Sequence, residues 1–323
     1  MNLTKVVKKI NAEIAEFGFG EEPKELYEPI RYTMEAGGKR LRPLLTVWGT
    51  WLFSDDVEKA YKPAIGVELF HNFTLMHDDI MDNAPLRRGM PSVHTKWNPN
   101  IAILAGDVML VKVYDLLAEV EESKVKRVIN SFNDCASNVC EGQQLDMNFE
   151  TRMDVSEAEY LEMIRNKTAV LLGYCLELGA LIGGAEDKNI RLLREAGESI
   201  GIGFQLKDDL LDIYGDEKSF GKKKAGDITA NKKTFLLIKA LEAAGNEDKK
   251  ILKDLYSSSG IQDDEKIRKV MAIYDKLGIK SLTEKKIDDY FKEGLKKISS
   301  IDASLFRKGR LKNFIRELID REK

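Results

Sequence analysis

Apolar residues recur every three to four positions along almost the whole chain, which is the spacing of one face of an α-helix. Helices are expected at residues 3–17, 23–36, 43–53, 60–82, 101–118, 123–149, 155–184 and 188–214. The remainder of the chain continues this pattern, with breaks at Gly245, at residues 257–260 and at Gly278. Because the alternating β-branched runs that mark strands are missing, the sequence predicts an all-α helical bundle.

Two of the expected helices end in a cluster of aspartates with the same spacing. The first cluster consists of Asp78, Asp79 and Asp82, and the second consists of Asp208, Asp209 and Asp212. On a helix, Asp78 and Asp82 share one face and Asp79 lies about 100° away from them. Neighbouring carboxylates repel one another, so the pattern favours bound Mg²⁺, which takes one or two carboxylates together with water and phosphate oxygens. A solvated acidic turn could explain one such cluster but hardly two.

Basic residues accompany both clusters. Residues 37–43 read Gly-Gly-Lys-Arg-Leu-Arg-Pro at an expected turn between helices, where Lys39 and Arg42 could hold an anion without metal. Arg87 and Arg88 follow the first cluster. The second cluster is followed by Lys222, Lys223, Lys224, Lys232 and Lys233. Each run alone reads as solvated surface, but the repeated order predicts a diphosphate bridged by metal and cations between the two clusters. The apolar positions before Asp78 predict that the rest of the ligand is greasy.

The bulk composition limits the organisation of the chain. It has 323 residues, of which 43% are hydrophobic, with no linker or repeat, so we expect one domain over residues 1–323. The net charge of −3 gives no reason to expect a nucleic-acid partner. No window is long and apolar enough to span a membrane, and the N-terminus lacks the apolar segment of a secretory signal. The three cysteines do not form a disulfide framework, so a cytoplasmic protein is expected.

These motifs together resemble the trans-isoprenyl diphosphate synthases, the polyprenyl synthetase family, and in particular its short-chain members that make farnesyl or geranylgeranyl diphosphate. The resemblance runs from about residue 37 to residue 237. It implies an all-α bundle around a central cavity, usually a homodimer, that binds Mg²⁺ and holds three ions once substrate is present. One departure is Ala225, because many members of the family have glycine there.

The resemblance also implies a role for each residue that matches a family motif. The Mg²⁺ ligands would be Asp78, Asp82 and Asp208, with Asp79, Asp209 and Asp212 binding directly or through water. The allylic diphosphate would contact Arg87, Lys167, Thr168, Gln205, Lys222 and Lys232. Isopentenyl diphosphate would bind without metal to Lys39, Arg42, His71 and Arg88. The groups that act on the reacting diphosphate would be Asp78, Asp79, Asp82, Arg87, Lys167, Asp208 and Lys222. For His71, the alternative is a core histidine that bonds to a backbone carbonyl.

The implied reaction is a Mg²⁺-dependent head-to-tail (1′-4) condensation of isopentenyl diphosphate with dimethylallyl, geranyl or farnesyl diphosphate, with release of pyrophosphate. Phe73 lies five residues before Asp78, about 7.5 Å along a helix. A ring there, with Thr74 beside it, would form the floor of the elongation cavity, and in the family this pattern resembles short-chain synthases. We therefore expect an all-trans product of C15 to C20, with C20 favoured. The alternative is that Phe73 is an ordinary core residue.

Two other functions fit part of this pattern. A class I terpene synthase also ionises an allylic diphosphate, but it typically has one Asp-Asp-x-x-Asp motif and a second motif that mixes Asn, Ser or Thr with Glu. A catalytically silent helical partner of a true synthase typically loses aspartates or the arginine pair. This chain keeps two aspartate clusters and both arginines, so elongation is favoured.

Overall fold

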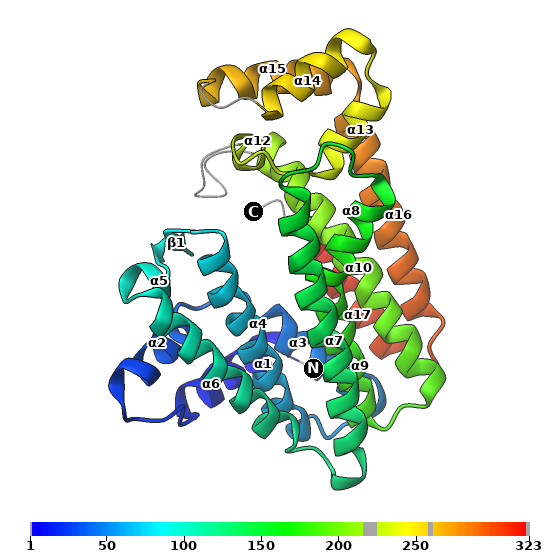
Figure 1. The fold of residues 1–323 in the computed structure, drawn as a ribbon. Helices are drawn as coiled ribbons and strands as arrows, with labels where there is room; N and C mark the ends of the chain where they lie inside the picture. The colour runs from blue at the N-terminus through cyan, green and yellow to red at the C-terminus, as the bar shows by residue number, and fades with distance from the viewer. Residues whose placement is uncertain (1, 216–224, 258–260, 321–323) are drawn as a thin grey trace. The chain divides into compact units, whose positions relative to one another are not determined.

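The computed structural model describes residues 2–215, 225–257 and 261–320, and these residues fold almost entirely as α-helices (Figure 1). The described part contains one pair of strands, a short antiparallel hairpin of β1 (Leu86–Arg87) and β2 (Met90–Pro91). The all-α prediction is confirmed. None of the described helices is both long enough and apolar enough to cross a membrane. The expected cytoplasmic location stays a prediction.

Contacts divide the chain into two compact units. The first unit comprises Met1–Cys135, Tyr174–Arg194 and Ile301–Lys308, and the second comprises Ala136–Gly173, Glu195–Ser300 and Gly309–Lys323. The expectation that residues 1–323 act as one domain therefore stays a prediction.

Helix α4 (Tyr61–Met81) is the central element of the first unit, and it ends in the first aspartate cluster. It packs against α1 (Leu3–Glu16), α2 (Lys24–Glu35), α3 (Leu41–Phe53) and α6 (Pro99–Leu117). The remaining short helices are η1 (Glu58–Ala60) and α5 (Val93–Lys96). The sequence is apolar almost all round α3, and residues 43–50 of this helix are all buried.

The second unit is organised around α10 (Asp187–Tyr214), most of which belongs to it and which ends in the second aspartate cluster. Before it, α8 (Glu157–Ile164) and the π-helical turn η2 (Arg165–Ala169) belong to this unit, whereas α7 (Glu122–Phe149) and α9 (Val170–Gly183) are divided between the two units. The helices after it are α12 (Gly226–Thr229), α13 (Phe235–Ala243), α14 (Asn246–Ser257), α15 (Asp263–Lys276), α16 (Ile279–Ser299) and α17 (Leu305–Asp320). In Figure 1, α8, α10 and α16 run alongside one another. A Cβ on Gly203 of α10 would lie 2.9 Å from the Phe291 ring of α16, so the helices meet closely there.

The predicted helix bounds agree with the structure to within a few residues, and the differences lie where distant contacts decide the backbone. Residues 83–99, expected as a loop, contain the hairpin and α5. The expected helix over residues 155–184 starts after Ser156, which forms a capping box with Glu159, but η2 interrupts it. A further break separates α16 from α17, where the Asn189 side chain accepts a hydrogen bond from the backbone N–H of Asp302 at 2.9 Å.

Candidate active site

The first aspartate cluster occupies the last turn of α4. Asp82 caps the helix, and its backbone N–H donates to the carbonyl of Asp78 at 2.8 Å. Asp78 is half-buried and Asp82 is exposed, whereas Asp79 is only 3% exposed. Helical spacing explains this difference, because Asp78 and Asp82 share a face of the helix that Asp79 does not.

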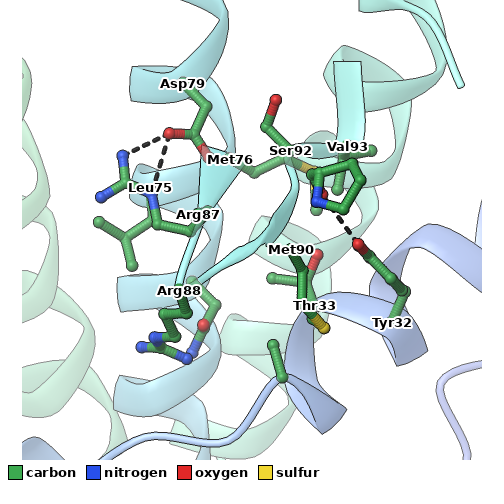
Figure 2. A pocket seen from close by; sticks show the side chains of 13 residues that line it. Tyr32, Thr33, Leu75, Met76, Asp79, Arg87, Arg88, Met90, Ser92 and Val93 are labelled. Carbon is green, nitrogen blue, oxygen red and sulfur yellow. Dashed lines mark hydrogen bonds and ion pairs between the residues drawn. The ribbon is translucent and has the colours of Figure 1, made fainter. Parts of the chain in front are cut away.

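Arg87 of strand β1 is bonded to the inward-facing aspartate. Its Nε donates to Asp79 Oδ1 at 2.9 Å and its Nη2 donates to the same oxygen, as the dashed lines in Figure 2 show. The Arg87 Nη2 atom also lies 3.6 Å from Asp78 Oδ2. Burial raises the pKa of Asp79, and the Arg87 guanidinium acts against this rise. The structure therefore brings the arginine predicted for the allylic diphosphate to the first cluster.

Arg88 links the same hairpin to the turn at residues 37–43. Arg88 and Gly89 form the two-residue loop with φ of 53° and 76°, as in the I′ turns that suit a hairpin. The Nη1 of Arg88 donates to the carbonyl of Gly37, and a Cβ on Gly38 would lie 3.2 Å from the Arg88 guanidinium. The second arginine and the glycine-rich turn, both assigned to isopentenyl diphosphate, are thus in direct contact.

The turn itself exposes one cation and partly covers another. Gly37, Gly38 and Arg40 all have positive φ, of 76°, 145° and 48°. Lys39 is exposed, and Arg42 is half-buried in the first turn of α3. A left-handed backbone costs a residue other than glycine about 1–2 kcal/mol, so the side chain of Arg40 must make contacts that offset this cost.

His71 lies on α4 among these arginines. Burial lowers its pKa well below the usual value, and the charges of Arg42, Arg88, Arg87 and Arg40 lower it further. The ring is therefore neutral near pH 7 and can donate or accept a hydrogen bond. Its backbone carbonyl accepts from Thr74 Oγ1 at 2.8 Å. This cationic surrounding is what an anion site requires, and a core histidine would not need it.

A pocket lies between α2, α4, the hairpin and α5 in the first unit (Figure 2). Its apolar walls include Leu75, Met76 and Met90, and Asp79, Arg87 and Arg88 also line it. Tyr32 of α2 closes one side, since its hydroxyl donates to the carbonyl of Pro91 at 2.8 Å (Figure 2). The pocket therefore lies beneath the hairpin that holds both arginines.

The second aspartate cluster ends α10 in the second unit. Asp208 is exposed, Asp212 is half-buried and Asp209 is 4% exposed. The hydroxyl of Tyr160 donates to Asp209 Oδ2, and Gln205 Nε2 donates to Asp209 Oδ1 at 3.1 Å. Burial first, and then the charge of Asp227, raises the pKa of Asp209 to about 7, although both hydrogen bonds act against the rise.

Lys167 and Thr168 lie within the π-helical turn η2, a feature that often marks functional sites. Lys167 Nζ lies 2.5 Å from Asp146 Oδ2 of α7, and Thr168 Oγ1 donates to Gln205 Oε1 at 3.0 Å. A Cβ on Gly142 of α7 would lie 2.2 Å from the Lys167 backbone nitrogen, so only glycine fits there. The structure thus brings together three of the residues predicted for the allylic diphosphate. The sequence did not point to Asp146, which lies one helical turn after Gly142 on α7.

The segment after the second cluster is described only in part. Lys222, with Lys223 and Lys224, lies outside the described residues. Ala225 has φ of 60°, and its N–H donates to the carbonyl of Asp212 at 2.8 Å. Asp212 Oδ2 accepts from the N–H of Asp227 at 2.9 Å. A left-handed backbone conformation favours glycine, which is the residue that the family resemblance led us to expect at this place.

The two lysines at the end of this segment differ. Lys232 is exposed. Lys233 is buried, and its Nζ donates to the carbonyls of Glu150 and Asn231 at 3.0 and 2.7 Å. Lys233, which the sequence had placed in the same basic run, therefore serves the packing of the second unit.

Phe73 is half-buried on α4. Its ring centroid lies 4.6 Å from that of His77 and 5.7 Å from that of Phe70. His77 in turn packs on α6, where a Cβ on Gly106 would lie 2.2 Å from its Nε2. The expected role of Phe73 as the floor of an elongation cavity stays a prediction, as does that of Thr74.

The donor chemistry of both clusters fits Mg²⁺. Each cluster lies at the carboxyl end of a helix, where the helix dipole favours a cation over added carboxylates. Among the described residues, no group of three or more His, Cys, Asp or Glu side chains is arranged to bind a metal ion by itself. Mg²⁺ usually completes its shell with water and substrate phosphates, so these donors fit a metal that binds together with a diphosphate.

The all-α fold and the two carboxylate clusters with their cationic neighbours define a prenyltransferase, an enzyme that uses isoprenoid diphosphates. The chain belongs to the polyprenyl synthetase family, whose sequence pattern matches residues 23–274. The predicted family and enzyme class are confirmed.

Relatives and solved structures give the same result. The chain is 44% identical over 235 residues to a geranylgeranyl diphosphate synthase of Methanosarcina mazei, covering 72% of each chain. It is 36% identical over 315 residues to a geranylgeranyl pyrophosphate synthase of Geoglobus acetivorans, covering 97% of this chain and 95% of that protein. A crystal structure of a geranylgeranyl pyrophosphate synthase superposes with a TM-score of 0.95 at 40% identity, covering both chains completely.

Proposed function

We propose that this chain condenses isopentenyl diphosphate with allylic diphosphates, head to tail, and that its main product is the C20 all-trans prenyl diphosphate. The observation that carries this proposal is the pair of aspartate clusters, each at the carboxyl end of a helix and each with two carboxylates that are more exposed than the third. The identity to geranylgeranyl diphosphate synthases supports the C20 product.

The aspartates would hold the metal and the cations would hold the substrates. The direct Mg²⁺ ligands would be Asp78, Asp82 and Asp208, with Asp79, Asp209 and Asp212 as direct or water-mediated partners of up to three ions. The allylic diphosphate would contact Arg87, Lys167, Thr168, Gln205, Lys222 and Lys232. Lys39, Arg42, His71 and Arg88 would hold isopentenyl diphosphate.

The chemistry follows from charge. Bound Mg²⁺ would stabilise the negative charge that builds up on the departing pyrophosphate. Arg87 and Lys167 would add fixed positive charge to the same oxygens as the allylic C–O bond breaks. The double bond of isopentenyl diphosphate then attacks the allylic carbon, and the released pyrophosphate accepts the proton that is lost. Apolar side chains must exclude water, which would otherwise capture the cation.

The test is a product assay. Purified protein is incubated with Mg²⁺, labelled isopentenyl diphosphate and one allylic primer at a time, and the products are separated by carbon number. We expect C20 to dominate with each primer and EDTA to abolish turnover. Cyclic hydrocarbons without consumption of isopentenyl diphosphate would indicate a terpene synthase. Turnover that appears only after a second synthase is added would indicate a silent partner.

Product length has its own test. Replacing Phe73 with Ala removes a ring from the proposed floor, so products longer than C20 are expected. Phe132→Ala, which removes another buried ring that packs 5.0 Å from Phe70, is the control for general loosening of the core. An unchanged product distribution in Phe73→Ala would remove this residue from the proposal.

The homodimer implied by the family has a candidate surface on α6. Four large apolar side chains lie exposed along one side of this helix: Ile103, Leu104, Val111 and Tyr114. The exposed fraction of Val111 reaches 61%. An apolar helix face of this kind is typical of an interface. We expect Val111→Glu to convert a dimer into a monomer in light scattering, whereas Leu305→Glu, at an exposed leucine of α17, leaves the mass unchanged.

A further inference from the structure

Arg40 is an arginine of the basic turn that points away from solvent. It is 5% exposed, although Lys39 beside it is exposed. Its guanidinium donates in three directions, to Asn11 Oδ1 of α1 at 3.1 Å, to the Met34 carbonyl of α2 at 2.8 Å and to Glu68 Oε1 of α4 at 2.8 Å. One side chain thus ties three helices to the turn.

The backbone of Arg40 shows that this contact fixes the turn. Its φ of 48° is left-handed, and it is the N-cap residue of α3, with its carbonyl accepting from the Leu44 N–H at 3.1 Å. The contacts of the side chain therefore hold the backbone of Arg40 in a left-handed conformation that an arginine rarely adopts. Lys39 precedes this residue and Arg42 lies two residues after it, so their directions depend on it.

Glu68, which accepts a hydrogen bond from Arg40, lies on α4, the helix that carries His71. It is 2% exposed and lies on α4 three residues before His71, about one helical turn away. Its charge also reaches Arg88, whose pKa is lowered mainly by burial and raised in part by Glu68. The Arg40–Glu68 pair therefore joins the turn that carries Lys39 and Arg42 to the helix that carries His71.

We propose that Arg40, paired with Glu68, is a positioning residue for the metal-free diphosphate site formed by Lys39, Arg42, His71 and Arg88. It does not touch the ligand, because it is 5% exposed and its guanidinium is bonded to Asn11, Met34 and Glu68. It sets the distance between the turn and α4, and so the affinity for isopentenyl diphosphate. This inference rests on the proposed function for the identity of the ligand.

The experiment compares three variants in steady-state kinetics with both substrates varied. Arg40→Met leaves Glu68 buried without its guanidinium and can unfold the protein, so Arg40→Met with Glu68→Leu removes both charges and keeps the volume. Asn11→Ala removes one bond from an exposed side chain. We expect the double variant to raise KM for isopentenyl diphosphate by about tenfold to a hundredfold. The KM for the allylic primer should change by less than about threefold, since neither Arg87 nor the second unit's residues proposed for that substrate are replaced. Asn11→Ala should give a smaller rise of the same kind.

Arg31→Met is the matched control. Arg31 of α2 also donates to a backbone carbonyl, that of Gly20 at 2.6 Å, and lies outside the site. It should lower the melting temperature without changing either KM. A folded double variant with an unchanged KM for isopentenyl diphosphate would overturn the inference, as would equal rises in both KM values.

Calorimetry separates this inference from the proposed function. The titrant is isopentenyl diphosphate alone, without metal or primer. If the wild type binds it but makes no product, the elongation proposal fails and the weaker binding of the double variant still supports Arg40. If the wild type makes product and the double variant binds equally well, the Arg40 inference fails alone. If the wild type does not bind isopentenyl diphosphate, both fail.

Discussion

The two aspartate clusters have the same spacing at the same place on a helix, yet their surroundings differ. In the first, the buried Asp79 is bonded to the guanidinium of Arg87. In the second, the buried Asp209 is bonded to the phenol of Tyr160 and the amide of Gln205. The outer aspartates are more exposed in both clusters. The spacing therefore sets which carboxylates face outward, and the neighbours set the charge that the inner one can carry.

This difference suggests a division of labour between the outer and inner aspartates. In the proposed function Asp78 and Asp208 bind the metal, whereas the inner aspartates Asp79 and Asp209 are bonded to protein side chains. The first unit compensates the inner charge with a cation. Among the described residues, the second offers only neutral donors, which do not overcome the effect of burial and of Asp227, so the pKa of Asp209 is raised to about 7. Four predictions test this comparison.

The largest effect is expected for the outer aspartates. Asp78→Asn and Asp208→Asn each remove a proposed metal ligand, so kcat should fall on the order of a thousandfold, about 4 kcal/mol in the barrier. The measurement is the rate of isopentenyl diphosphate incorporation at saturating Mg²⁺. Asp115→Asn, at an exposed aspartate of α6 that pairs only with Lys112 in the described contacts, should keep full activity. Comparable activity in all three variants would refute the assignment.

The inner aspartates should respond with opposite signs in stability. Asp79→Asn leaves Arg87 without its carboxylate and should lower the free energy of unfolding by about 2 kcal/mol. Asp209→Asn removes a buried carboxylate that no described cation compensates and should raise it by about 1 kcal/mol. Both are measured by denaturant unfolding at pH 8 with EDTA, above the pKa of Asp209. If both variants change the free energy of unfolding in the same direction, the proposed difference between the two clusters is wrong.

The burial of His71, together with the charges of the arginines around it, should be visible in the pH dependence of stability. The pKa of His71 is lower in the folded protein than in the unfolded chain, so below about pH 6.5 the unfolded chain takes up the proton first. Stability is therefore lost as the pH falls. From pH 7 to pH 5.5, the wild type should lose about 1 kcal/mol more than His71→Gln. Parallel curves for the two proteins would mean that the histidine is not held neutral.

The smallest effect concerns the residues that follow the clusters. In the segment after the first cluster, Gly89 has φ of 76°, a conformation that suits glycine. In the segment after the second cluster, Ala225 has φ of 60°. Ala225→Gly should therefore raise the free energy of unfolding by about 0.5–1 kcal/mol. Ala230→Gly, where φ is −77°, should lower it by a similar amount. A loss of stability at both positions would show that the Cβ of Ala225 matters more than its backbone.

The sequence alone predicted the features that repeat within one element. The helix positions and the shared face of Asp78 and Asp82 follow from spacing along a single helix. Family motifs extended this to the polyprenyl synthetase family. What could not be predicted depends on contacts between elements. Examples are the ion pair of Lys167 with Asp146, the inward course of Arg40 and the burial of Lys233, each of which needs a partner far away in the chain.

The π-helical turn η2 has a consequence for how sequence changes act on this protein. It contains one residue more than an α-helical turn would use, and Gly142 provides the space for it. Deleting one residue there would turn the π-helical turn into a regular α-helical turn. The residues on one side of the deletion would then rotate about the helix axis by about 100° relative to those on the other side. The ion pair of Lys167 with Asp146 would then be lost although neither residue is replaced. Scanning by substitution would not detect this dependence, whereas a single-codon deletion, or an insertion that restores the count, would reveal it.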